Sequence, residues 1–104
     1  ESKMRLLTAA RRGDWEEVER ELDEGALINS REDETLLNCL MFAAIQCSAE
    51  RVWMLAQRKA QLDLRDQTGL TAAHFAVQAG DVESVAILHH AGADLSLETL
   101  EGKT

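Results

Sequence analysis

The chain has 104 residues and a formal net charge of −8, with 45% apolar and 4% aromatic residues. A single domain of this length can bury a core, and no apolar run approaches the length of a membrane-spanning helix, about 18 residues, so we expect no insertion into a membrane. The acidic balance argues against a nucleic-acid partner, because phosphate binding requires clustered Lys and Arg, and it is typical of a soluble surface.

The start of the chain predicts two short helices separated by a glycine. Residues 3–12 carry apolar side chains at helical spacing, and Gly13 ends this helix. Asp14 can cap a second helix, whose polar face is strongly acidic. Gly25 suits the left-handed position after the last turn of that helix. Its apolar stripe recurs at i, i+3 and i+7 and consists of Trp15, Val18 and Leu22.

The middle of the chain repeats this arrangement with other residues in the glycine positions. A first helix is predicted over 36–44, and Ser48 can cap a second one. Cys47 separates the two helices and Lys59 follows the second, where a glycine would adopt a left-handed backbone at lower cost. We therefore expect strain or a different closure at Lys59. The apolar residues of the two helices are Leu36, Leu37, Leu40, Met41, Ala43, Ala44, Val52, Leu55 and Ala56.

The last third contains the clearest pair of helices. Thr71 can cap a first helix over 72–79, and Asp81 can cap a second over 82–89. The segments that follow the second helices alternate between apolar and polar side chains, which predicts short extended arms that meet in a hairpin. The segments are 61–68 and 94–101, and the apolar stripe of the last helix is Val82, Val85 and Leu88.

These elements form a repeat with a period of about 33 residues. A shift of 33 places Phe75 on Phe42 and Leu88 on Leu55. Two short helices cannot bury both of their faces alone, so successive pairs are expected to stack and share a continuous core. The predicted single domain, 1–104, comprises units 1–32, 33–65 and 66–98 and the start of a fourth at 99–104.

The pattern resembles the ankyrin repeat, which combines a β-turn and two helices with a Thr-Pro-Leu-His-x-Ala signature. Ala72 and Cys39 replace the signature proline, Leu36 replaces the turn glycine of unit two, and unit one lacks the signature. The resemblance implies an all-α repeat fold: an α-solenoid of stacked helix-turn-helix units joined by short β-hairpin-like loops, here a fragment of a longer array. Unit three matches at Asp66, Gly69, Thr71, His74, Ala76, Gly80, Val85, Leu88, Gly92, Ala93 and Asp94.

Chemical sites are weakly indicated. Residues 102–104, Gly-Lys-Thr, look like the end of a phosphate-binding loop, but Leu97 stands where that loop needs its first glycine. No nucleophile lies beside a base, so we expect no enzyme, no cofactor and no metal. The two cysteines are expected to be reduced thiols of an intracellular protein, with the cytoplasm favoured over the nucleus. The histidines and cysteines that fit no zinc template are His74, His89, His90, Cys39 and Cys47.

The aromatic residues and one asparagine leave alternatives open. Trp15 and Trp53, with the two phenylalanines, could form a cage for a methylated lysine, but we favour core packing for them. The resemblance implies that the histidine at position 74 bonds neighbouring backbone and supports the hairpin. It also allows hydroxylation of Asn29, at the start of the first hairpin.

The resemblance further implies a binding surface made by the hairpin tips and the exposed side of the first helices. The sequence predicts a monomeric interaction module of a scaffold or adaptor with a protein or peptide partner. The alternative is a regulatory segment of an enzyme or channel whose active domain lies elsewhere. Leu37 and Leu70 are either exposed contacts or packed within the hairpins. The predicted partner-binding residues are Arg11, Arg12, Glu32, Glu34, Leu37, Ile45, Gln46, Arg65, Gln67, Leu70 and Gln78.

Overall fold

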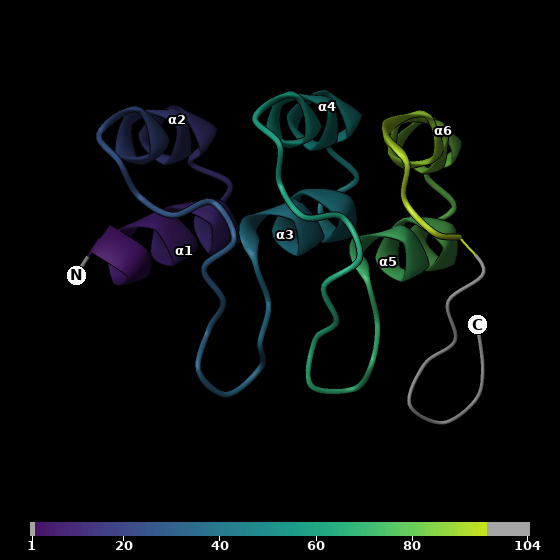
Figure 1. Ribbon diagram of the computed structural model, residues 1–104, viewed down its shortest axis with the longest axis horizontal. Coiled ribbons are helices and arrows are strands. Elements are labelled where there is room, and N and C mark those ends of the chain that lie inside the picture. The colour runs from purple at the N-terminus through teal and green to yellow at the C-terminus, as the bar shows by residue number, and fades with distance from the viewer. Residues whose placement is uncertain (1, 96–104) are drawn as a thin grey trace.

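A computed structural model describes residues 2–95. Within that range the chain forms helices only, in two rows, and no strand is present (Figure 1). The expected extended arms are therefore loops rather than strands as far as residue 95, and those expected beyond it lie outside the described residues. The helices are α1 Ser2–Arg12, α2 Trp15–Asp23, α3 Cys39–Ile45, α4 Ala49–Gln57, α5 Ala72–Ala79 and α6 Val82–Ala91.

Each pair of helices packs against the next pair. Helix α3 lies between α1 and α5, and α4 contacts both α3 and α6. Figure 1 shows α1, α3 and α5 as an inner row, α2, α4 and α6 as an outer row, and long loops that extend beyond the inner row. This arrangement confirms the predicted all-α repeat fold.

The helix starts are set mainly by side-chain caps. Asp14, Thr71 and Asp81 each accept a hydrogen bond from the backbone N–H three residues along the chain, as predicted. His74 completes a capping box, because its Nδ1 accepts a hydrogen bond from the backbone N–H of Thr71 at 2.9 Å. The predicted cap at Ser48 is wrong in one respect: Ser48 precedes α4, but its side chain makes no capping hydrogen bond.

The first helix of unit two begins later than predicted. Asn38 caps α3 by accepting a hydrogen bond from the Met41 N–H at 2.8 Å, and the helix starts at Cys39. Leu36 has a φ of 61°, a left-handed conformation that an α-helix cannot include. Leu36 and Leu37 therefore belong to the hairpin, and Leu36 occupies the backbone conformation of the turn glycine that it replaces.

The core runs along the facing sides of the two rows. Leu6, Met41, Leu55 and Leu88 are among its fully buried side chains, so every unit contributes. Trp15 is buried as predicted, whereas Trp53 is 54% exposed, so its predicted core role is wrong. Val82 also departs from the predicted stripe and is 78% exposed, because it lies in the first turn of α6, the last outer helix.

Two short connections carry non-glycine residues in the left-handed region. Cys47 has a φ of 56° and Lys59 a φ of 71°, at positions where unit three has Gly80 and Gly92. In this region a residue with a Cβ costs about 1–2 kcal/mol of folding free energy relative to glycine. The difference is partly offset, because glycine loses more conformational entropy on folding than any other residue. The strain expected at Lys59 is thus present in the backbone.

We expect Lys59→Gly to raise the free energy of unfolding by about 0.5–1 kcal/mol, because the relief of the left-handed backbone exceeds the entropic cost of glycine. The side chain is exposed, and among residues 3–95 it forms no ion pair that the substitution would remove. Urea unfolding of the 104-residue chain measures the change. Lys59→Ala is the control, because it removes the side chain and keeps the Cβ; an equal gain from Lys59→Ala would refute the backbone explanation.

Candidate protein-interaction surface

The predicted binding residues lie on the inner helices and on the two hairpins. Arg11, Ile45 and Gln78 are at or near the C-terminal ends of α1, α3 and α5, and the hairpins occupy the loops that precede α3 and α5 (Figure 1). The two loops extend from the same side of the inner row (Figure 1), and a contact between Arg11 and Glu32 joins the first of them to α1. Some of the predicted residues form hydrogen bonds within the chain, whereas others are exposed and have none from their side chains.

Arg11 and Glu32 tie the first hairpin to α1. The Arg11 guanidinium donates a forked pair of hydrogen bonds to the Glu32 carboxylate, with the shortest distance at 2.7 Å. The same guanidinium carbon lies 5.1 Å from the ring centroid of Phe42 in α3. Burial raises the pKa of Glu32, but hydrogen bonds donated by Arg11 and Thr35 outweigh it, so the pKa of this carboxyl is lowered. Both residues thus hold the hairpin in place.

We expect the Arg11–Glu32 pair to contribute about 0.5–1 kcal/mol at neutral pH, measured as the coupling free energy in a cycle of Arg11→Ala and Glu32→Gln. Because the folded pKa of Glu32 lies below its ordinary value of 4.5, this stability is present above pH 4.5 and is lost as pH falls through the folded pKa. Coupling that stays constant down to pH 2 would contradict the assignment.

Gln46 is a structural bridge between units one and two. Its Nε2 donates to the Ala10 carbonyl at 2.8 Å, and its Oε1 accepts a hydrogen bond from the Trp15 indole Nε1 at 3.1 Å. Trp15 is only 6% exposed, so few other acceptors can reach its N–H. Sequence reasoning placed Gln46 on the binding surface, and the structure gives its side chain a second role that joins the stacked units.

The second hairpin is tied to the first. The backbone N–H of Gln67 donates to the Thr35 carbonyl at 2.9 Å, and Arg31 donates to the Arg65 carbonyl at 3.2 Å. The Arg65 guanidinium in turn donates to the Gly69 carbonyl at 2.9 Å. These bonds hold the two hairpins in a fixed relation, which pre-organises the surface they form.

The two leucines of the hairpin tips are half-buried. Leu37 packs against the core, and Leu70 is half-buried in the second hairpin. The observed burial favours the packing interpretation over that of two fully exposed contacts. Leu27, by contrast, is 75% exposed in the first loop and was not predicted as a surface residue.

A smaller set of predicted residues is exposed, and their side chains take no part in this internal network. Ile45 is 44% exposed, although it ends the inner helix of the central unit. Within residues 3–95, no side-chain hydrogen bond or ion pair is found for the polar members of the set. They can therefore meet a partner without breaking internal contacts. The exposed members are Arg12, Glu34, Ile45, Gln67 and Gln78.

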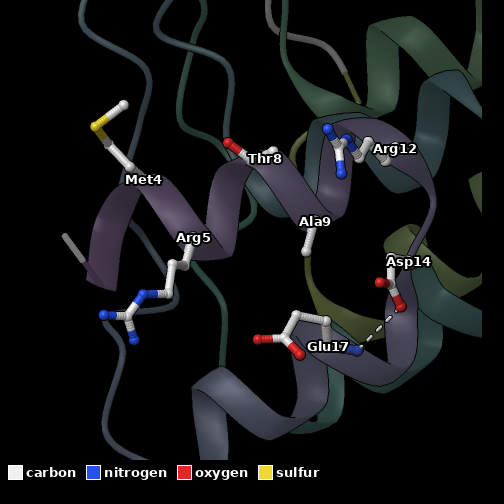
Figure 2. Close-up of a pocket in the computed structure, with 7 residues that line it drawn as sticks. All are labelled: Met4, Arg5, Thr8, Ala9, Arg12, Asp14 and Glu17. Atoms are coloured by element: carbon white, nitrogen blue, oxygen red, sulfur yellow. Dashed lines mark hydrogen bonds between the residues drawn. The ribbon is translucent and has the colours of Figure 1, made fainter.

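A pocket of about 320 Å³ opens between α1 and α2 (Figure 2). Arg5 extends from α1 toward α2, and Glu17 comes from α2, where its backbone N–H donates to Asp14. Arg12 also lines this pocket, so the two adjacent arginines at the end of α1 have different surroundings. The lining mixes two guanidinium groups with two carboxylates, which is typical of a hydrated surface rather than of a site for a charged ligand.

The described residues offer little for catalysis or metal binding. Between residues 2 and 95 no group of three or more His, Cys, Asp or Glu side chains could hold a metal ion. Burial raises the pKa of the Cys39 thiol to about 12, so it is a poor nucleophile, and Cys47 is exposed and unbridged. Residues 102–104 lie outside the described range.

Two further sequence-based suggestions can be placed in the structure. The Asn29 side chain accepts a hydrogen bond from the Gln61 N–H at 2.8 Å, and thereby links the two loops. Trp15 and Trp53 form no cage, since one is buried and the other exposed. Among the helices of residues 2–95, none has the length and apolar character to cross a membrane.

Comparison with known proteins agrees with the stacked helix pairs described above. The family model for ankyrin repeats (3 copies) matches residues 6–99, nearly the whole chain. No match to a curated protein was found. The match to the family model covers all three helix pairs, and the chain belongs to the ankyrin repeat family.

Proposed function

We propose that this chain is a non-catalytic interaction module of an intracellular scaffold or adaptor, monomeric and cytoplasmic. Ankyrin repeats are generally protein–protein interaction modules. The observation that carries the proposal is the exposed Ile45, an apolar side chain that ends α3, the inner helix of the central unit. Binding uses the groove set, defined as Arg12, Glu34, Ile45, Gln67 and Gln78.

The mechanism is rigid presentation of this groove set to a protein or peptide. The Arg11–Glu32 fork and the bond between Gln67 and Thr35 hold the hairpins before any partner arrives. Pre-organisation lowers the entropic cost of binding, so a larger share of the contact energy appears as affinity. Three units offer a small interface, so the expected affinity is modest.

Capture from cell lysate tests the proposal. The groove variant combines Arg12→Glu, Ile45→Lys and Gln78→Lys, which change the exposed residues and leave the net charge unaltered. We expect partners of the unaltered chain to be depleted at least about tenfold, as expected when charges oppose a formed interface. The control combines Glu16→Lys and Lys59→Glu, also neutral overall, at exposed positions in α2 and in the loop that follows α4. Equal capture by the groove variant and the unaltered chain would contradict the proposal.

A further inference from the structure

The outer row carries an aromatic side chain that the core does not use. Trp53 of α4 is 54% exposed and lines an open groove of about 450 Å³ between α4 and α6. The two helices contact each other and are neighbours in the upper row of Figure 1. The groove, hereafter the Trp53 groove, is lined by Ala49, Glu50, Trp53, Glu83 and Ile87.

The charge of the Trp53 groove is negative. Glu50 and Glu83 are both exposed, and neither takes part in an ion pair within the described part of the chain. The nearest arginine in sequence, Arg51, is engaged with Glu19 of α2 at 3.4 Å. The basic side chains of α6, His89 and His90, lie in its last turn, whereas Glu83 lies in its first. No ion pair within the described residues therefore neutralises the carboxylates beside Trp53.

The repeat itself shows that this groove is a local feature. Glu16, Glu50 and Glu83 occupy the second position of α2, α4 and α6, so the carboxylates recur in every unit. Trp53 stands where unit one has Glu19 and unit three has Ala86. An indole flanked by two carboxylates is thus specific to the boundary between units two and three. Packing gives no reason for it, because more than half of the side chain faces solvent.

We propose that the Trp53 groove binds an extended, arginine-bearing segment of a protein partner. A guanidinium stacks on an indole face by cation–π attraction and can donate paired hydrogen bonds to a neighbouring carboxylate. Packed helices have axes about 8–10 Å apart. An extended chain in the polyproline II conformation advances about 3.1 Å per residue with about three residues per turn, so arginines three residues apart share one face and reach both glutamates. A purely apolar segment is disfavoured, because it would bury both carboxylates unpaired.

This surface is separate from the groove set, which lies on the inner helices and hairpins. A chain with both would hold two partners, or two segments of one partner, on opposite rows of the solenoid. Because the two surfaces share no residue, either assignment can fail without the other.

A synthetic peptide provides a direct test. We would titrate Ser-Arg-Ser-Ser-Arg-Ser into the ¹⁵N-labelled 104-residue chain and follow the indole N–H signals of both tryptophans by NMR. The Trp53 signal should shift in a saturable manner that weakens with added salt. The Trp15 signal should stay in place, because that indole is buried and bonded to Gln46. The matched peptide with glutamine in place of arginine should give no shift.

Variants separate the Trp53 groove from general charge attraction. Trp53→Leu keeps an apolar side chain without an aromatic face, and the pair Glu50→Gln and Glu83→Gln removes the charge; each should weaken peptide binding about threefold to fivefold. Glu16→Gln changes the equivalent carboxylate of unit one and should leave binding unchanged. Three results would overturn the proposal: no shift of Trp53, equal binding of the glutamine peptide, or equal weakening by Glu16→Gln. A Trp53 shift that depends on protein concentration alone would assign the groove to a second copy instead and would also overturn it.

Discussion

Leu55→Ala is expected to lower the free energy of unfolding by about 2–5 kcal/mol, the largest effect of any single substitution considered. Leu55 is fully buried in α4, which packs against both α3 and α6. Truncation leaves a cavity in unit two. Because units one and three both stack on unit two, their packing against it is weakened as well. Because a domain of this size has a stability of about 5–15 kcal/mol, the loss should appear as a large shift of the urea midpoint.

Val82→Ala is the matched control for that measurement. Val82 is also apolar and lies in an outer helix, but it is 78% exposed. Its truncation should change the free energy of unfolding by less than about 0.5 kcal/mol. Similar losses of unfolding free energy for Val82→Ala and Leu55→Ala would contradict the observed burial. They would indicate that Val82 is buried with the apolar stripe, as the sequence predicts.

Gln46→Ala is expected to cost about 1–3 kcal/mol, although the residue looks like a surface glutamine in the sequence. The substitution removes the bond to the Ala10 carbonyl and leaves the Trp15 N–H without its acceptor. Trp15→Phe provides the second arm of a cycle, because it removes the donor. In the Trp15→Phe background, Gln46→Ala should cost clearly less, as measured by urea unfolding. Full additivity of the two substitutions would refute the bridge.

The parts of the fold that sequence reasoning predicted well are those with local causes. Asp14, Thr71 and Asp81 cap helices because a short polar side chain can accept a hydrogen bond from the backbone N–H three residues further along the chain. This relation is local and is visible in the sequence. Gly80 and Gly92 end α5 and α6 in left-handed conformations, as glycine permits. In unit three, which has both signals, α5 was predicted with its observed bounds and α6 with its observed start, but α6 extends to Ala91 rather than His89.

The errors arise where tertiary packing outweighs local preference. Leu36 is a good helix former, yet the hairpin requires a left-handed residue at that position, and the helix starts at Cys39 instead. Val82 continues an apolar periodicity, yet it is 78% exposed. Trp53 was assigned to the core as a large aromatic residue, yet it is 54% exposed. Periodicity predicts which residues share a helix face; it does not show whether another helix lies against that face.

The places of the predicted binding residues in the repeat could be read from the sequence, but their contacts could not. The period of the repeat brings Arg11, Gln46 and Arg65 to the inner helices and hairpins, which the sequence indicates. Their hydrogen bonds to Glu32, to the Ala10 carbonyl and to the Gly69 carbonyl depend on side-chain geometry between units. Comparison of Trp53 with the residues at equivalent positions, Glu19 and Ala86, could have identified it as an unusual residue on a solvated face.

Photo-crosslinking from one position of each row tests the central claim most directly. A photoreactive amino acid at position 45, in the groove set, and at position 16, on α2, would be activated in cell lysate with the 104-residue chain. We expect a discrete adduct with a protein partner from position 45 and none of the same mass from position 16. The same adduct from both positions, or from position 16 alone, would contradict binding through the inner helices and hairpins.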